Sequence, residues 1–219
     1  MSSAGSSRPF KVAVLASGAG TNLQALLDQV HGRDGIEIVA VASDKVDAPA
    51  LGRADRAGVP ARAFGRVEYG GDRAARDQAI ADWVVEREAD LVVLAGFTQV
   101  LGADFLTRFP DAVINVHPAL LPAFPGMHAI AQALAYGVKV FGVTVHFVDE
   151  GVDTGPVILQ RAIELPDARA VDDVLPRIHE IEHVLLPEAV RLIARGEVRI
   201  DSADRRRVQV GPLAEVSDR

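Results

Sequence analysis

The stretch KVAVLASGAGTNLQALLDQV, residues 11–30, decides the fold. It opens with the apolar run 11–17, which is typical of a strand buried on both faces, and then passes through Gly18 and Gly20. Leucine and valine side chains recur at helical spacing from Asn22 to Val30. The stretch therefore predicts a strand, a glycine turn and a helix.

The same order recurs through the first half of the chain, where each apolar run precedes a helical pattern. Strands are predicted at 37–43, 60–65, 90–96 and 112–117, and helices near 49–57, 72–88 and 99–107. Apolar runs that alternate with helices indicate a mostly parallel sheet with helices on both faces. The predicted fold class is α/β, doubly wound.

The pattern changes after Pro118, where a proline-rich loop begins. It is followed by a helix near 128–136, β-like runs at 140–148 and 156–165, a long helix at 170–195 and short strands at 197–201 and 206–210. We expect the C-terminal part to be more antiparallel than the first half. We predict one domain over residues 10–210, with flexible tails at 1–9 and 211–219.

Composition excludes several classes of protein. The 219 residues contain no cysteine, which excludes disulfides and thiolate metal sites, and the formal net charge of −7 disfavours nucleic acid and anionic membranes as partners. No apolar run is long enough to span a bilayer, and the start MSSAGSSRPF lacks the apolar core of a secretion signal. We therefore expect a cytoplasmic protein that acts on small molecules.

The glycine turn SGAGTNL, residues 17–23, is a candidate phosphate site. Open parallel sheets bind ligands beyond the carboxyl ends of their strands, where the N-terminus of a helix offers free amides. Leu23 stands where a dinucleotide site needs a third small residue, so one phosphate fits better than NAD. The alternative is a plain tight turn with Asn22 as a helix cap.

Asn115 and His117 lie two apart on a predicted strand, so their side chains share one face at its carboxyl end. An amide donor can stabilise an oxyanion, and a histidine can exchange a proton near neutral pH. Asp153 lies in a later turn, but spacing alone does not choose it over Asp149 or Glu150. A core histidine and an ordinary turn acid are the alternatives.

Five segments carry a resemblance to a known family: VLASGAGTNLQALLD, DLVVLAGF, INVHPALLPAFPG, VTVHFVDEGVDTGPVILQ and IHEIEHVLLP. In this order, over residues 11 to 200, they resemble the glycinamide ribonucleotide formyltransferase family. The resemblance implies a formyltransferase-type, Rossmann-like fold. It also implies transfer of the formyl group of 10-formyltetrahydrofolate, as co-substrate, to the amine of glycinamide ribonucleotide.

By this resemblance, Asn115, His117 and Asp153 correspond to the catalytic residues. We expect Asn115 and protonated His117 to donate to the oxyanion, Asp153 to orient the histidine and pass a proton, and no metal to take part. His128 and His146 also match family positions, either as structural histidines or in a direct role.

The resemblance also implies binding residues. The amides of Gly20, Thr21 and Asn22 are expected to hold the phosphate, and Glu182 the glycinamide and ribose end. The residues expected to border the folate are Arg73, Thr98, Gln99, Val100, Leu101 and Asn115. The family commonly has Met-Arg-Ile-Leu where this chain has Thr98 to Leu101, so a positive charge is missing at Gln99.

Several alternatives stay open at this point. A formyltetrahydrofolate hydrolase or another formyl-folate transferase shares the formyl-folate domain, and a non-catalytic nucleotide-binding module shares the fold. An NAD-dependent dehydrogenase would need a ribose-binding acid, for which Asp44 is a weak candidate. The expected assembly is a monomer or a homodimer.

Overall fold

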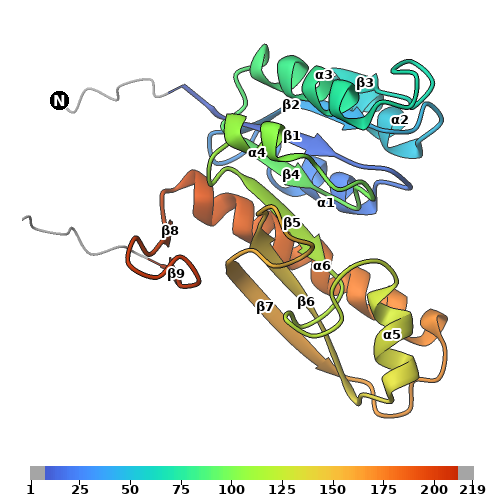
Figure 1. Ribbon diagram of the computed structural model, residues 1–219. Coiled ribbons are helices and arrows are strands. Elements are labelled where there is room, and N and C mark those ends of the chain that lie inside the picture. The colour runs from blue at the N-terminus through green and yellow to red at the C-terminus, as the bar shows by residue number, and fades with distance from the viewer. Residues whose placement is uncertain (1–7, 212–219) are drawn as a thin grey trace, which may run out of the picture.

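The computed structural model describes residues 8–211, and its centre is a seven-stranded sheet in the order β3-β2-β1-β4-β5-β6-β7 (Figure 1). The strands are β1 (Phe10–Leu15), β2 (Ile36–Ser43), β3 (Ala61–Ala63), β4 (Leu91–Leu94), β5 (Val113–His117), β6 (Val140–Phe147) and β7 (Val157–Glu164). The pairs among β1 to β5 are parallel, whereas β6 and β7 are antiparallel additions. A separate antiparallel pair, β8 (Val198–Ile200) and β9 (Val208–Val210), follows near the C-terminal end.

Helices cover both faces of the sheet (Figure 1). They are α1 (Thr21–Gln29), α2 (Pro49–Arg56), α3 (Arg73–Val85), α4 (Ala103–Arg108), α5 (Ala129–Tyr136) and α6 (Val171–Ala194). Helices α1, α2, α5 and α6 contribute to the apolar cluster on one face, and α3 and α4 to the cluster on the other. The arrangement is a doubly wound α/β fold, as predicted.

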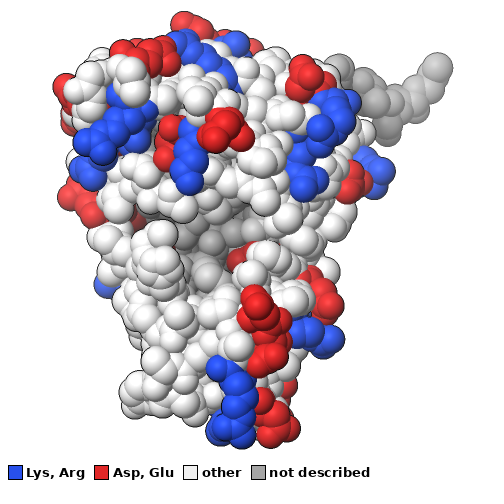
Figure 2. Space-filling model, turned by 90° about the vertical axis from the view of Figure 1, so that its right-hand side faces the viewer, with Lys and Arg blue, Asp and Glu red and all other residues white. Residues whose placement is uncertain are grey.

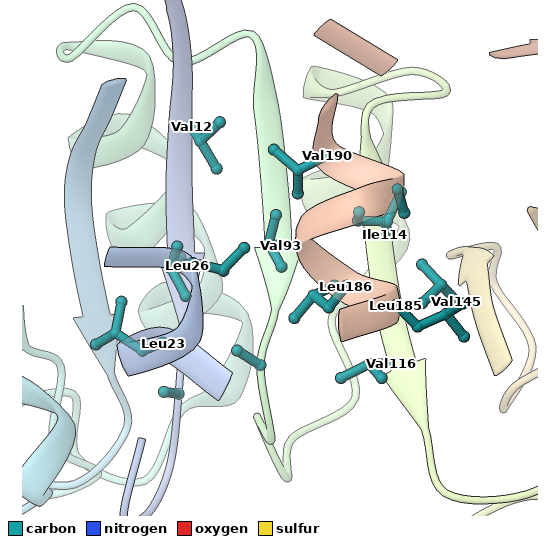
Figure 3. Close-up of a cluster of buried hydrophobic side chains, with 14 of the residues drawn as sticks. Val12, Leu23, Leu26, Val93, Ile114, Val116, Val145, Leu185, Leu186 and Val190 are labelled. Atoms are coloured by element: carbon teal, nitrogen blue, oxygen red, sulfur yellow. The ribbon is translucent and has the colours of Figure 1, made fainter. Parts of the chain in front are cut away.

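The alternation of side chains along β1 explains why its sequence is apolar throughout. Val12 and Val14 belong to one buried cluster, and Ala13 and Leu15 to the other, all fully buried. Figure 3 shows the first cluster, in which side chains from the strands face α1 and α6. Burial of a large aliphatic side chain contributes roughly 1.5–3 kcal/mol, so each strand is held from both sides.

The predicted elements are all present, with small differences at their ends. The largest is α4, which begins at Ala103 rather than near residue 99. Side chains hold the preceding loop in place: Ser17 Oγ accepts from the Thr98 amide at 2.9 Å, and Asp77 Oδ2 accepts from the Gly102 amide at 3.2 Å. These two bonds fix the segment as a loop, and helix begins only after it.

The ends of the chain were predicted to be flexible tails. Residues 1–7 and 212–219 lie outside the described residues, and the division into one domain over 10–210 stays a prediction. Within residues 8–211, none of the helices combines the length and the apolar character that crossing a membrane requires.

Candidate active site

A cavity of about 540 Å³ lies beyond the carboxyl ends of β4 and β5. Its walls come from residues 96–101, 115–118, 126–131 and 151–154. Figure 2 shows a hollow with a largely uncharged rim on the side of the molecule that lies at the right in Figure 1. A concave, mostly apolar site with a few polar groups is the usual form of a small-molecule site.

Asn115 and His117 both line this cavity, as their spacing predicted. Asn115 pairs with His146 across β5 and β6, which brings the Asn115 amide Nδ2 within 3.2 Å of His146 Nε2. The same amide donates to Asp153 Oδ1 at 3.3 Å. Both contacts are long for hydrogen bonds, so a ligand oxygen can replace either partner.

Asp153 is held at the centre of the cluster. Its backbone has a left-handed φ of 52°, which is uncommon for a residue with a side chain. Oδ2 accepts from the Gly126 amide at 2.7 Å and lies 3.3 Å from His117 Nδ1, while Oδ1 lies 3.5 Å from His146 Nε2. Burial raises the pKa of Asp153, but the bonds and charges of His146, Gly126 and His117 outweigh burial and hold the pKa at about 2. Asp153 is therefore a carboxylate at neutral pH.

His117 is only 5% exposed and has acceptors on both sides of its ring. Nε2 lies 2.9 Å from the Phe124 carbonyl, which can only accept, so a proton on Nε2 makes this bond. Burial lowers the pKa of His117 below its usual 6.5 and outweighs Phe124 and Asp153, which raise it. The neutral imidazole is therefore the main form at neutral pH, and Nδ1, beside Asp153, is free to take up a proton. Donation by protonated His117 to the oxyanion stays a prediction.

The glycine turn offers amides of the kind predicted. Gly20 has a φ of 71°, and a Cβ there would lie 2.8 Å from the Ala50 Cβ, so only glycine fits. From α2, the Ala50 amide donates to the Gly18 carbonyl at 3.2 Å and Arg53 Nε donates to the Ala19 carbonyl at 2.7 Å. Because N–H and C=O point in opposite directions across a trans peptide, the Gly20 amide points away from Arg53.

The amides of Gly20, Thr21 and Asn22 donate to no protein acceptor within residues 8–211. They are the first amides of α1, which have no partner inside a helix, and they carry the positive end of its dipole. An anion bound here would accept from them.

Glu182 of α6 lies beside this turn, because Asn22 Nδ2 donates to Glu182 Oε2 at 2.9 Å. Burial raises the pKa of Glu182 to about 7, against the lowering effect of Asn22. The Oδ1 atom of Asn22 is buried and has no hydrogen-bond partner in the described part of the chain. The pair offers acceptors to a ligand that carries hydroxyl or amine donors.

The residues expected to border the folate fall into two places. Thr98, Gln99, Val100 and Leu101 all line the main cavity, whereas Arg73 lines a second pocket of about 240 Å³. This second pocket is formed by Arg66, Gly71, Asp72, Arg73, Arg76 and Gln99. Gln99 lines both and so stands between them.

Sequence reasoning missed Arg76, which supplies a cation behind Gln99. Arg76 Nη1 donates to Gln99 Oε1 at 3.3 Å, and its Nη2 pairs with Asp77 at 2.9 Å, both side chains being at most 7% exposed. Its position one turn after the start of α3, three residues beyond Arg73, was the available signal. A guanidinium thus lies next to position 99, with its charge already paired with Asp77.

The sequence is compatible with either a structural or a direct role for His128 and His146. His146 contacts both Asn115 and Asp153, as described above, and its Nδ1 lies 2.7 Å from the Phe147 carbonyl. His128 lines the cavity with a left-handed φ of 64°, directly before α5. Within residues 8–211, no group of three or more His, Asp or Glu side chains is arranged to hold a metal ion.

Comparisons with known proteins agree with this geometry. The sequence pattern of formyl transferases matches residues 10–190. Phosphoribosylglycinamide formyltransferase of Bacillus subtilis (strain 168) is 40% identical over 192 residues, which cover 85% of this chain and 98% of that protein. The trifunctional purine biosynthetic protein adenosine-3 of Bos taurus is 41% identical over 191 residues, so the match spans 87% of this chain but only 19% of that longer protein.

A solved structure is similar over almost its whole length. The crystal structure of glycinamide ribonucleotide transformylase 1 from Symbiobacterium toebii has a TM-score of 0.88 and 44% identity, and the match covers 95% of this chain and 99% of that one. With the match to the family pattern and the relatives above, the chain belongs to the formyl transferase family.

Proposed function

We propose that this chain transfers the formyl group of 10-formyltetrahydrofolate to the amine of glycinamide ribonucleotide, a step of purine biosynthesis. The observation that carries the proposal is the convergence of Asn115, His117 and Asp153 on one cavity at the carboxyl end of the sheet. An amide donor, a titrating imidazole and a carboxylate are the groups that acyl transfer to an amine requires.

The residues divide the chemistry as follows. The folate supplies the formyl group, whose oxygen gains negative charge as the amine attacks its carbon. Asn115 donates to this oxygen in place of one of its two long contacts. The proton that the amine loses passes by way of the Asp153 carboxylate to the free Nδ1 of His117. His117, once protonated, returns a proton to the folate nitrogen as the C–N bond breaks.

We place the ribonucleotide across the glycine turn. The free amides of Gly20, Thr21 and Asn22 fit a phosphate, and the contacts from α2 hold two of the turn's carbonyls away from it. Asn22 Oδ1, which has no partner within residues 8–211, and the carboxyl of Glu182 fit the hydroxyl and amine donors of the sugar and glycinamide end.

The folate ring fits the wall formed by residues 96–101, and its anionic tail the second pocket beside Gln99. Three arginines line this pocket, Arg66, Arg73 and Arg76, and only Asp72 among the lining residues is acidic. Arginine binds carboxylates in a planar, two-point geometry. In this assignment Arg66 and Arg73 supply the charge that Gln99 lacks, because the charge of Arg76 is already paired with Asp77.

We further infer that the protein works in the cytoplasm as a monomer or homodimer and without nucleic acid. The net charge of −7 supports the last point, because nucleic-acid sites need local positive charge.

The test is a formyl-transfer assay with the purified chain, 10-formyltetrahydrofolate and glycinamide ribonucleotide. The proposal expects formylated ribonucleotide and tetrahydrofolate in equal amounts, formed only when both substrates are present. A control without ribonucleotide measures release of formate by water. Formate release at the same rate with and without ribonucleotide would make the chain a hydrolase, and no folate turnover at all would refute both readings.

A further inference from the structure

Three polar side chains form a row across neighbouring strands. His117 of β5 pairs with Thr144 of β6, and Thr144 pairs with Gln160 of β7. Directly paired residues on antiparallel strands project from the same face, so the three side chains stand side by side. Only the first of them belongs to the proposed catalytic group.

The loop between β5 and α5 lies over this row and is bonded to all three members. Thr144 Oγ1 donates to the Ala119 carbonyl at 2.7 Å and accepts from the Leu121 amide at 3.1 Å. Gln160 Nε2 donates to the Leu121 carbonyl at 2.8 Å and to Thr144 Oγ1 at 2.9 Å. Every hydrogen-bonding position of the Thr144 hydroxyl and both protons of the Gln160 amide are therefore used.

Packing fixes the same segment of the loop. The Leu120 side chain lies over Gly142 of β6, where a Cβ would come within 2.5 Å of Leu120 Cδ2. The loop thus has one firmly held stretch, residues 119–121, resting on β6 and β7.

Beyond this stretch, the loop supplies two backbone groups to the active site. The Phe124 carbonyl accepts from His117 Nε2 at 2.9 Å, and the Gly126 amide donates to Asp153 Oδ2 at 2.7 Å. Phe124 has a left-handed φ of 54°, which is a strained conformation for a residue with a side chain. Such a conformation persists only where the surroundings hold it.

We propose that Gln160 is a positioning residue for formyl transfer: through Leu121 it holds the loop that orients His117 and Asp153. The effect of Gln160 on kcat rests on the proposed function, whereas its effect on the His117 imidazole can be measured without that function. Gln160 lies on an edge strand, outside the cavity walls, and touches neither the reacting atoms nor the three catalytic side chains.

The test replaces Gln160 with methionine, which keeps the length of the side chain and removes both donors. Burial lowers the pKa of His117, and the bond from its Nε2 to the Phe124 carbonyl raises it. A loosened loop weakens this bond, so the pKa of His117 should shift and its two neutral tautomers should mix. The other titratable groups that face His117 are Asp153 and His146, and residues 118–126 contain none, so no other group on the loop explains a shift. The imidazole is followed by NMR titration without substrates.

The matched control is Arg161→Met on the same strand, whose side chain is half exposed and lies 3.7 Å from Glu188. We expect Gln160→Met to lower kcat by roughly 10-fold or more with little change in the KM of the ribonucleotide, and Arg161→Met to change neither. Gln160→Glu, which places a carboxylate against the Leu121 carbonyl, should be slower still.

Melting temperatures of all variants separate positioning from simple stability. A lower Tm for Gln160→Met with unchanged kcat and an unchanged His117 pKa would overturn the inference. A wild-type chain without formyl transfer would refute the proposed function alone, since the NMR shift would still report whether Gln160 positions the loop.

Discussion

The two regions that we propose to bind and convert the substrates are built in different ways. The glycine turn between β1 and α1 offers backbone amides from three consecutive residues, 20–22, and two carbonyls of the turn are held by one neighbouring helix. The catalytic cluster uses side chains from β5, β6 and the turn at Asp153, together with backbone groups of a loop. The three amides of the turn come from consecutive residues, whereas the side chains of the cluster come from segments up to 38 residues apart.

This difference indicates a division of labour. Amides at the N-terminus of a helix hold charge without titrating, which suits a phosphate that stays bound throughout the reaction. Proton transfer needs groups whose protonation changes, and those are gathered in the cluster: a carboxylate whose pKa is about 2 and an imidazole whose pKa lies below its usual value. Mutations in the two regions should therefore fail in different ways.

The largest effect is expected from His117→Ala and Asp153→Asn. Removal of a positioned proton-transfer group typically lowers kcat by about 10²- to 10⁴-fold, and each variant should fall in that range. Because Asp153 contacts His117 directly, at 3.3 Å, the double variant should be scarcely slower than the slower single variant. Steady-state kcat for the two singles and the double measures this coupling.

If the losses in kcat of the two single variants multiply in the double variant, His117 and Asp153 act independently and do not form one catalytic unit. Circular dichroism and Tm of each variant serve as the control for folding. A core histidine and a turn acid without catalytic roles would show lower Tm and near-normal turnover.

The buried carboxyl of Glu182, beside the turn, should make the stability of the chain depend on pH. Its pKa is about 7 when folded and about 4.5 in its usual range, so the folded chain holds the proton more tightly. Stability from this group is therefore present at low pH and is lost as pH rises from about 4.5 through about 7. Glu182→Gln should remove this loss and stabilise the chain at pH 8, relative to wild type, by on the order of 3 kcal/mol.

Urea unfolding at pH 5 and pH 8 measures this change. The control is Glu188→Gln on the same helix, at a side chain that is 46% exposed; this variant keeps Glu182 and should keep the pH dependence of the wild type. An equal gain in stability at pH 8 in both variants, or no gain in Glu182→Gln, would contradict the raised pKa of the Glu182 carboxyl.

Gly20→Ala tests whether the glycine turn binds the phosphate of the ribonucleotide. A Cβ at Gly20 meets Ala50 at 2.8 Å and sits at a positive φ, whereas a Cβ at Gly18 meets nothing within 4 Å. Hydrogen bonds to a charged ligand are worth about 1.5–3 kcal/mol, so Gly20→Ala should raise the ribonucleotide KM by roughly 10- to 100-fold and the folate KM much less. Gly18→Ala is the matched control, and an equal rise in both KM values would remove the turn from the phosphate site.

The smallest effect is expected at Gln99. Arg66 and Arg73 already line the pocket beside it, so Gln99→Arg should lower the folate KM only a few-fold, with kcat unchanged. Arg73→Gln, in the second pocket, should raise the same KM. A lower kcat in Gln99→Arg would show instead that the new charge disturbs the loop at residues 96–101.

The fold was accessible from sequence because its signals are local. Runs such as 11–17 alternate with helical patterns, and each strand could be placed within a few residues. The shared face of Asn115 and His117 followed from the period of a strand, and both do line the cavity. The glycine turn could also be identified from sequence, because it lies directly between an apolar run and a helical pattern.

The rest of the site depends on contacts that no spacing reveals. Spacing did not separate Asp153 from Asp149, and only the structure shows their different roles. Asp149 Oδ1 accepts from the Gly151 amide at 3.1 Å and from Thr154 Oγ1 at 2.5 Å, which closes the turn, while Asp153 is left to contact the histidines. The contribution of His146 depends on the register of β6 against β5, which residues far apart in the chain decide.

The central claim is that the turn holds the ribonucleotide while the cluster does the chemistry, and Asp153→Asn tests it most directly. On one sample of this variant, isothermal titration gives the Kd of the ribonucleotide and rapid quench gives the single-turnover rate of formyl transfer. The account predicts a Kd within about 3-fold of wild type and a rate at least roughly 100-fold lower. A near-normal rate in the folded variant, or a loss of binding as large as the loss of rate, would contradict it.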